Sequence, residues 1–526
     1  MDVGDGDKSS VIAFDSKARA RCSLEPPDLL LSFQRATLDE LCGALLERKQ
    51  RGMLLCYEMG LGKTVLTLAL VLEMLRRSPT IDNAGDATNA GWFLIVCPKA
   101  VLAQWSEEFL RRSNLPAHLV HRYAPTRGHP MPPEALERHT TGIVLASYPT
   151  LVRSFHVNGD KGPFGVRWRL LVLDESHTIR TSGTLVHRAV SYLAEYSPHS
   201  QRLCLTGTPF VNRWEDLVPQ AAFVGVEPYD QRASWNVNHG RREWIREWAR
   251  RTVIRVVRAD VPFEQLPLPP LARHDVRLDF SANEWRCYGA MWSIAKAGLD
   301  QVRANTHVLT RPLDPNAKTR MQVLAGAVRL RDVLDRIQRL RRCCNHPCMG
   351  LTDPGRQALA DRGVLTTRHT PSTKIRWTVD LIERETALDS RCKFIVFSQW
   401  IDTLDLVQAE LQRRRDAAET VGESARMRYA RLDGRMTEEQ RIHAVRLFVG
   451  EPSCRVMLLT LGAGAHGLNL MVANRVVILD QWWNEAVENQ VSIAVGCNFD
   501  TSSRCRRSFV RSASARPSAF TATLCT

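Results

Sequence analysis

Short apolar runs alternate with longer amphipathic stretches over the first half of the chain. Each run ends in a polar or Gly/Pro-rich turn and is followed by a segment with helical spacing. Buried strands that alternate with helices are typical of a parallel sheet covered by helices on both faces. The runs that we interpret as strands are residues 53–56, 93–97, 142–146, 170–173 and 202–205.

The same alternation returns later in the chain, in apolar runs at 393–397, 429–432, 456–459 and 476–479. Between the two series lies a long, basic, largely helical-looking region with a proline-rich break at residues 266–270. The pattern therefore predicts an α/β protein with two lobes and a helical insertion between them.

Length and composition agree with this division. A chain of 526 residues is too long for one compact core, and its 44% hydrophobic and 24% charged residues are typical of a globular protein. No run approaches the roughly 18 uncharged apolar residues of a membrane span. The acidic N-terminus, Met1 to Asp5, lacks an apolar leader. We therefore expect an intracellular protein with no membrane partner, which its 14 scattered cysteines also fit.

The net charge of +15 makes a polyanion such as nucleic acid a candidate partner. Residues 491–526 hold five arginines and one aspartate, a net of +4, which leaves +11 for the rest of the chain. Charge alone does not separate a nucleic-acid surface from a solvated basic surface.

Candidate chemistry begins where the first predicted strand ends. Residues 58–64, Glu-Met-Gly-Leu-Gly-Lys-Thr, stand between that strand and a helical run. Such a unit turns backbone N–H groups and a helix N-terminus toward one point, which suits a phosphate chain. Lys63 would contact the β- and γ-phosphates, and Thr64 would hold Mg²⁺. The alternative is a glycine-rich helix entry with an incidental lysine, since Tyr57 breaks the strict spacing.

Two adjacent acids, Asp174 and Glu175, close the predicted strand 170–173. One carboxylate can reach Mg²⁺, and the other can orient or deprotonate the attacking water. The alternative is a helix N-cap, because acids favour the start of a helix. The phosphate loop earlier in the chain favours the catalytic interpretation.

These motifs, with residues 205–209 (Leu-Thr-Gly-Thr-Pro), resemble helicase superfamily two in order and spacing. The segment 340–347, Leu-Arg-Arg-Cys-Cys-Asn-His-Pro, narrows the resemblance to the Swi/Snf-like branch. The resemblance explains the cysteines around His346 as a structural segment, and the alternative is a metal site that lacks half of its ligands. Further motifs in family order are residues 30–34, 98–105, 397–400, 432–434, 464–470 and 480–484.

The resemblance covers about residues 25–490 and implies two RecA-like lobes, each a parallel sheet flanked by helices, with ATP and Mg²⁺ between them. It implies a DNA-dependent ATPase that moves along double-stranded DNA, of the chromatin-remodelling or DNA-repair type. The implied partners are duplex DNA and nucleosomes or other DNA-bound proteins, and the implied location is the nucleus.

The resemblance also assigns roles to residues of this chain. Lys63, Asp174 and Glu175 would be catalytic, with Thr64 and Asp174 on Mg²⁺. The nucleotide would be bound by Gln34, which reads adenine, and by Glu58, Met59, Gly60, Leu61, Gly62, Lys63 and Thr64. DNA would be contacted by Lys99, Gln104, Trp105, Ser147, Ser398, Gln399, Trp400, Gly464 and Gly467.

We predict five segments along the chain. The segments are a flexible N-terminus (1–24), a first lobe (25–230), a helical insertion (231–372), an incomplete second lobe (373–490) and a disordered basic tail (491–526).

Within the insertion, the stretch from Arg241 to Arg258 carries Trp244 and Trp248 at helical spacing, which favours helix packing over phosphate contacts.

The chain departs from the family after Gln490. The family continues with arginines that reach the γ-phosphate, whereas residues 491–497 are Val-Ser-Ile-Ala-Val-Gly-Cys. Such arginines are worth about 10³–10⁵ in rate, so the chain as written would bind ATP and hydrolyse it feebly. Because Val491-Ser492 can be encoded by a splice-donor-like sequence, the tail is either a read-through intron or the end of a truncated isoform or decayed gene.

Three functions follow as hypotheses. The first is an active duplex-DNA ATPase, and the second is a catalytically weak ATP-binding scaffold. The third, a single-strand or RNA helicase, is disfavoured by the Asn345-His346-Pro347 signature.

Overall fold

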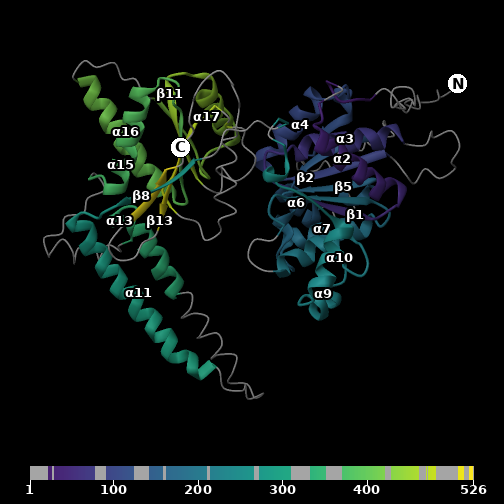
Figure 1. The fold of residues 1–526 in the computed structure, drawn as a ribbon, viewed down its shortest axis with the longest axis horizontal. Coiled ribbons are helices and arrows are strands. Elements are labelled where there is room, and N and C mark those ends of the chain that lie inside the picture. Colours follow the sequence, from purple (N-terminus) through teal and green to yellow (C-terminus); the bar gives the residue numbers. More distant parts are fainter. Residues whose placement is uncertain are drawn as a thin grey trace, which may run out of the picture. The chain divides into compact units, whose positions relative to one another are not determined.

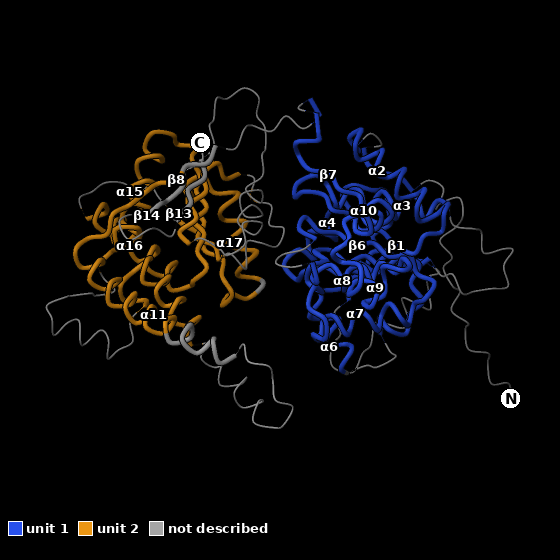
Figure 2. Tube along the Cα trace, turned by 60° about the horizontal axis from the view of Figure 1, so that its bottom comes forward, with its two compact units in different colours: residues 1–267, 466–468 blue, residues 268–465, 469–526 orange. Residues whose placement is uncertain are grey.

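The chain divides into two compact units in the computed structural model, one of residues 1–267 and 466–468 and the other of residues 268–465 and 469–526 (Figure 2). Among the described residues, no single helix combines the length and the apolarity of a membrane span. The structure describes residues 22–26, 29–77, 91–123, 141–157, 162–209, 214–262, 264–265, 272–309, 332–350, 370–420, 428–460, 470, 472–480, 508–513 and 520–524.

The first unit is built on a seven-stranded sheet in the order β3-β4-β2-β5-β6-β1-β7, with every pair parallel (Figure 1). Four of its strands, β1, β2, β4 and β5, are buried along their whole length. This burial on both faces is why they are continuous apolar runs in the sequence. The strands are β1 (Gly52–Tyr57), β2 (Gly91–Cys97), β3 (Val120–Arg122), β4 (Thr141–Ser147), β5 (Leu170–Asp174), β6 (Gln201–Leu205) and β7 (Val253–Val256).

Helices cover both faces of this sheet, because successive side chains of a strand point to opposite faces. One core contains Met53, Leu55 and Tyr57 of β1. It is covered by α2 (Ser32–Cys42), α3 (Lys63–Arg76) and α4 (Leu102–Arg111). The other core contains Leu54 and Cys56 of the same strand. It is covered by α6 (Tyr148–Val157), α7 (Leu185–Tyr196), α8 (Val218–Val224), α9 (Arg232–Asn238) and α10 (Arg242–Thr252).

The second unit has its own seven-stranded sheet, in the order β10-β11-β9-β12-β13-β14-β8. All its pairs are parallel except the two that β14 makes. Two helices, α15 (Thr373–Leu388) and α16 (Ile401–Thr420), pack on the sheet, and α17 (Glu438–Gly450) lies against β10 and β11. The strands are β8 (Ala272–Leu278), β9 (Phe394–Ser398), β10 (Arg428–Leu432), β11 (Cys454–Thr460), β12 (Arg475–Ile478), β13 (Ser508–Ala513) and β14 (Phe520–Leu524). The predicted α/β fold with two lobes is therefore confirmed.

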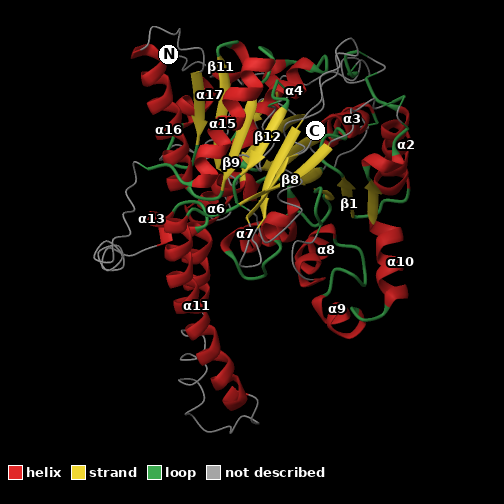
Figure 3. Ribbon diagram, turned by 60° about the vertical axis from the view of Figure 1, so that its left-hand side comes forward, coloured by secondary structure: helices red, strands yellow, loops and turns green. Residues whose placement is uncertain are grey.

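The helical insertion consists of α11 (Ala282–Leu309) and a second helix over residues 332–343. The two helices pack on each other through a small core that includes Cys287, Leu340 and Cys343. Figure 3 shows α11 extending away from the sheet of the second unit.

The structure corrects the predicted boundaries of this insertion. Residues 231–262 belong to the first unit, because β7 pairs with β1 and Trp235 and Trp248 are buried in the core on one face of its sheet. The ring of Trp244 lies edge-on to Trp235, with centroids 4.9 Å apart. This supports the helix-packing interpretation of the two tryptophans in α10.

The prediction of a disordered tail is wrong for residues 508–513 and 520–524. The first segment is β13, which pairs in parallel with β12, and the second is β14, which pairs antiparallel with β13 and β8. The physical reason is that a strand edge such as that of β12 offers backbone N–H and C=O groups to any extended segment. Composition, on which the prediction of disorder rested, does not register this pairing.

A buried polar network ties the insertion to the second sheet. Asn345 follows the second helix; its Nδ2 donates to Asp480 Oδ1, and its Oδ1 accepts from Lys374 Nζ at 2.8 Å. Asp480 also accepts hydrogen bonds from the Ser398 hydroxyl and, at 2.8 Å, from the backbone N–H of Gln399. The Asn-His-Pro signature is therefore a structural anchor at the carboxyl ends of β9 and β12.

His346 of the same signature contacts backbone groups. Its Nδ1 accepts the N–H of Cys348 at 3.2 Å, and its Nε2 lies 2.9 Å from the carbonyl oxygen of Thr370. Within the part of the chain that the structure describes, no three His, Cys, Asp or Glu side chains are grouped as a metal site requires.

Candidate functional site

The predicted phosphate loop joins β1 to α3 in the first unit. Gly60 and Gly62 have φ angles of 81° and 87°, in the left-handed region that glycine enters without strain. Gly62 is also the N-cap of α3, so the loop passes directly into the helix. Backbone N–H groups at a helix N-terminus are suited to bind an anion.

We expect Gly62→Ala to weaken nucleotide binding about tenfold. A Cβ at this position would lie 2.4 Å from Gln34 Nε2, in addition to the left-handed strain. Gly183→Ala is the matched control, because Gly183 has a φ of 82° and nothing within 4 Å of its Cβ position. Both variants carry the backbone strain, and thermal unfolding measures the loss of stability that this strain causes. Titration with a fluorescent ATP analogue measures nucleotide affinity, which should fall only in Gly62→Ala. Equal affinities for the two variants would contradict a role of the loop in binding.

A pocket of about 290 Å³ opens beside the loop. Gln34 lies in it, and its Nε2 donates to the carbonyl oxygen of Leu61 while its Oε1 accepts the N–H of Leu31, both at 2.9 Å. An amide that offers both a donor and an acceptor suits the edge of a nucleobase. The pocket is lined by Leu29, Leu31, Phe33, Gln34, Gly60, Leu61, Gly62, Val65 and Arg112.

Contacts from distant parts of the chain brace the loop. Glu58 accepts the backbone N–H of Arg258 at 2.8 Å, and the Arg258 guanidinium donates to the carbonyl oxygen of Met59 at 3.3 Å. The side chain of Tyr57 points into the core, where its hydroxyl donates to Thr37 at 2.6 Å. The unusual tyrosine therefore packs behind the loop, and the brace by Arg258 has no local signal in the sequence.

Asp174 lies at the carboxyl end of β5 and is held on three sides. Its Oδ2 accepts from Trp105 Nε1 at 2.8 Å, and its Oδ1 accepts the N–H of Glu175 at 3.0 Å. Its carbonyl oxygen accepts from the Tyr148 hydroxyl at 2.7 Å. Burial and the neighbouring Glu175 charge raise the pKa of Asp174, while the bond from Trp105 and the charge of Lys63 oppose this rise.

Glu175 combines a strained backbone with an unsatisfied carboxylate. Its φ is 48°, an uncommon value for a residue other than glycine, and the residue is only 7% exposed. Among the described residues, none forms a hydrogen bond to its Oε2, although His177 Nδ1 lies 3.3 Å from this oxygen. Burial raises the pKa of Glu175, and the charge of Lys63 lowers it. Strain and an unsatisfied buried oxygen at one residue are typical of a functional position.

The side chain of His177 links the two acids to the Thr-Gly-Thr segment, because its Nδ1 lies 3.3 Å from Glu175 Oε2. Burial, with the charges of Arg180 and Lys63, lowers the pKa of His177 to about 4, so its ring is neutral at pH 7. Its Nδ1 lies 3.1 Å from the hydroxyl of Thr206, which also accepts the N–H of Thr208 at 3.1 Å.

Lys63 completes the arrangement. Its ammonium group donates to the carbonyl oxygen of Tyr57 at 3.1 Å, and its positive charge acts on the pKa of both Asp174 and Glu175. The fold thus brings together the three residues that the sequence predicts to be catalytic, from two segments far apart in the chain.

The residues present fit Mg²⁺ and a triphosphate. The hydroxyl of Thr64 and the carboxylates of Asp174 and Glu175 are oxygen ligands of the kind that Mg²⁺ prefers. A divalent cation would offset the burial that raises the pKa of both carboxyl groups and the Glu175 charge that raises the pKa of Asp174. It would also allow Glu175 Oε2 to bind the cation or a water molecule.

The structure corrects part of the predicted DNA surface. The side chains of Trp105, Ser147 and Ser398 are buried, and their polar atoms form hydrogen bonds within the protein. A side chain enclosed in this way does not reach a duplex. Gly464 and Gly467 lie outside the described residues.

The remaining predicted DNA contacts are accessible to different degrees. Lys99 is exposed in the 3₁₀ turn that precedes α4, and Gln104 is half-buried in the first turn of α4. Gln399 accepts from Arg341 at 3.3 Å, and the same guanidinium lies 5.3 Å from the ring centre of Trp400. In this structure Gln399 and Trp400 therefore both contact Arg341 of the helical insertion.

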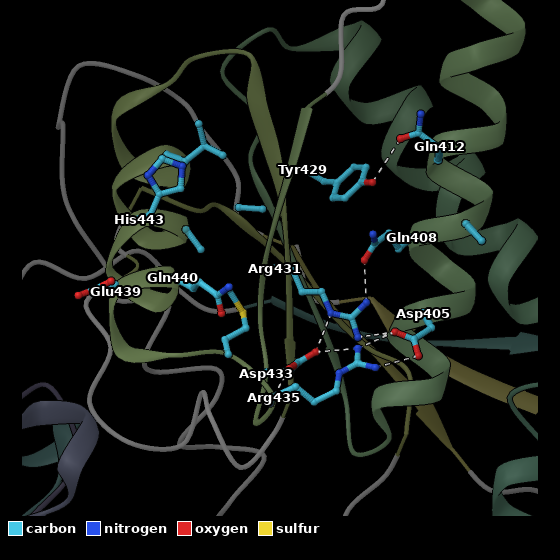
Figure 4. A pocket seen from close by; sticks show the side chains of 15 residues that line it. Asp405, Gln408, Gln412, Tyr429, Arg431, Asp433, Arg435, Glu439, Gln440 and His443 are labelled. Atoms are coloured by element: carbon cyan, nitrogen blue, oxygen red, sulfur yellow. Dashed lines mark hydrogen bonds and ion pairs between the residues drawn. The ribbon is translucent and has the colours of Figure 1, made fainter.

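A larger pocket, of about 1040 Å³, lies in the second unit between α16, β10 and α17 (Figure 4). Asp405 contacts Arg431 and Arg435 at 2.6 and 2.8 Å, and Asp433 contacts the same arginines at 2.7 and 3.1 Å. These two acids and two arginines neutralise each other, so the network offers no net charge to a phosphate chain. The sequence motif around Asp433 gave no signal of this pairing with α16.

Two family models match the chain. The model described as SNF2-related domain matches residues 34–349, more than half of the chain, and this range includes the phosphate loop, Asp174 and Glu175. The model described as Helicase conserved C-terminal domain matches residues 373–494.

The chain is also similar to individual proteins. It is 23% identical to the DNA repair protein RAD5A of Arabidopsis thaliana over 85% of this chain and 54% of the relative. It is 27% identical to the ISWI chromatin-remodeling complex ATPase ISW2 of Saccharomyces cerevisiae over 85% of this chain and 36% of the relative. The chain thus spans about half the length, or less, of these relatives. A solved structure of the Sulfolobus solfataricus SWI2/SNF2 ATPase core in complex with dsDNA aligns with 89% of this chain and 86% of that chain, at 21% identity and a TM-score of 0.36.

Proposed function

Because the chain belongs to the SNF2-related family of helicase superfamily two, we propose that it hydrolyses ATP in response to double-stranded DNA and uses the energy to move along the duplex. Its relatives include a DNA repair protein and a chromatin-remodelling ATPase. On this basis we propose a role in repair or remodelling, in the nucleus, on nucleosomes or other DNA-bound proteins.

The observation that carries the proposal is the state of Glu175. Its carboxylate is buried, its backbone is strained, and its Oε2 forms no hydrogen bond among the described residues, although His177 Nδ1 lies 3.3 Å from it. A structural helix cap would instead be hydrogen-bonded to backbone N–H groups, so the geometry favours the catalytic interpretation over the cap.

In the proposed mechanism each residue has one task. Lys63 and the loop N–H groups bind the β- and γ-phosphates, and Gln34 binds the adenine edge. Thr64 and Asp174 would hold Mg²⁺, which supplies positive charge to the transferring phosphoryl group. Glu175 orients the attacking water and accepts its proton. His177, which is neutral, links this acid pair to Thr206.

The test is the rate of ATP hydrolysis without nucleic acid and with duplex DNA, single-stranded DNA or RNA of equal length. We expect duplex DNA to stimulate most, and Lys63→Ala to reduce the stimulated rate by about 10²–10³-fold because a positive charge on the phosphates is lost. Lys296→Ala, at an exposed lysine of α11, is the control and should keep the rate. Greater stimulation by RNA than by duplex DNA would overturn the proposal in favour of an RNA helicase.

A second candidate, an ATP-binding scaffold with weak catalysis, is favoured by the sequence after Gln490. Residues 491–497 contain no arginine, although the family resemblance leads us to expect arginines that reach the γ-phosphate. Nucleotide binding without turnover by the purified chain would support the scaffold. Sequencing the transcript across the Gln490–Val491 junction would show which of the two chains the cell makes.

A further inference from the structure

Two buried aromatic side chains attach to the same acidic residue from different elements. Trp105 donates its Nε1–H to the Asp174 carboxylate at 2.8 Å, and Tyr148 donates its hydroxyl to the Asp174 carbonyl oxygen at 2.7 Å. Both side chains are at most 3% exposed. One bond fixes the carboxylate, and the other fixes the main chain that carries it.

The two donors lie in the segments that follow two neighbouring strands, β2 and β4. Trp105 lies in the first turns of α4, after β2, and Tyr148 is the first residue of α6, directly after β4. In the sheet order β4-β2-β5, β2 is the direct neighbour of β5 and β4 lies one strand further away. Because these strands are parallel, their carboxyl ends lie at the same edge of the sheet as Asp174. The segment before Trp105 begins with exposed Lys99 and half-buried Gln104.

We propose that Trp105 and Tyr148 are positioning residues that link the α4 and α6 segments to the Mg²⁺ carboxylate, so that DNA bound at the start of α4 sets the orientation of Asp174. The proposal rests on the proposed function, because it takes Lys99 and Gln104 to be contacts for duplex DNA. It gives Trp105 a role other than direct contact with the duplex.

The geometry explains why a movement of α4 would change the position of the Asp174 carboxylate. Both oxygens of Asp174 have donors, Trp105 at Oδ2 and the N–H of Glu175 at Oδ1, so the carboxylate plane is fixed. The indole is enclosed and packs on Phe109 of the same helix, with ring centroids 5.9 Å apart. A shift or rotation of α4 therefore moves the donor with it, and a hydrogen bond to a carboxylate is among the stronger ones that a neutral donor makes.

The test is Trp105→Phe, which keeps an aromatic ring and removes the N–H. We expect the affinity for a fluorescent ATP analogue to be unchanged without Mg²⁺, and the Mg²⁺ concentration needed for tight binding to rise about tenfold or more. Stimulation of ATP hydrolysis by duplex DNA should fall by a similar factor, while affinity for the duplex, measured without nucleotide, stays the same. Tyr148→Phe removes only a hydroxyl and should act in the same direction with a smaller effect.

Trp168→Phe is the matched control. Trp168 is equally buried, and its Nε1 donates to the carbonyl oxygen of Pro163 at 2.7 Å, so the variant loses the same kind of bond away from the carboxylates. It should keep the Mg²⁺ requirement of the wild type.

Two results would overturn the proposal. One is an unchanged Mg²⁺ requirement in Trp105→Phe, and the other is an equal loss of nucleotide affinity with and without Mg²⁺, which indicates general damage to the lobe. If duplex DNA does not stimulate ATP hydrolysis by the wild type, the proposed function is wrong, and so is the proposed link from bound DNA to Asp174. The Mg²⁺ titration, which contains no DNA, still decides whether Trp105 positions Asp174.

Discussion

Glu175→Gln should slow ATP hydrolysis by about 10²–10⁴-fold, because an amide cannot accept the proton of the attacking water. The substitution keeps the size and shape of the side chain, and in the buried site Oε2 forms no hydrogen bond with the described residues that the amide would break. Nucleotide binding should therefore persist, and affinity for duplex DNA should not change. Single-turnover hydrolysis and titration with a fluorescent ATP analogue measure the two effects separately.

Glu195→Gln is the control for this prediction. Glu195 is an exposed carboxylate on α7 in the same unit, so its removal should leave hydrolysis at the wild-type rate. If Glu175→Gln retains the wild-type rate, the general base is another group, and the strained backbone of Glu175 needs a different explanation.

Asp480→Asn should destabilise the second unit by about 3–5 kcal/mol, because it removes the main negative charge that acts on the buried Lys374 ammonium. Burial lowers the pKa of Lys374, and the Asp480 charge is the largest influence that opposes this effect. Asn345 lies between them, accepting from Lys374 and donating to Asp480, so an amide at 480 also breaks the pattern of donors and acceptors.

Hydrogen exchange in β9 and β12 measures this loss, because exchange reports the opening of one part of a chain that has two compact units. Asp402→Asn is the matched control. Asp402 contacts Arg342 at 2.5 Å but is 46% exposed, so breaking that pair should cost only about 0–1 kcal/mol. Similar protection in the two variants would show that the buried network does not stabilise the second sheet.

Local patterns were enough to find nine of the fourteen strands that the structure describes, and the candidate catalytic residues. Residue types within a few positions predict strand β1, the Gly60–Gly62 turn and α3. The reason is that a buried strand requires apolar residues and a left-handed φ angle favours glycine. The pairing of Asp174 with Glu175 at a strand end was visible for the same reason.

Contacts between distant segments were not visible in this way. Trp105 matches a family motif that contacts DNA, yet its indole is buried against Asp174, 69 positions later. Arg258 braces Glu58 from 200 positions away, and Asn345 bonds Asp480 across 135 positions. No periodicity within one segment encodes which partner such a donor will find.

By itself, then, the sequence determined the α/β class, the two series of strands and the residues Lys63, Asp174 and Glu175, because these depend on chemistry within a few neighbouring positions. The tertiary structure alone decided that Trp105 lies inside the protein, that β7 closes the first sheet and that residues 508–513 extend the second. The physical reason is that burial and strand pairing are properties of groups brought together by folding, and a backbone edge or an enclosed carboxylate accepts a partner from any point of the chain.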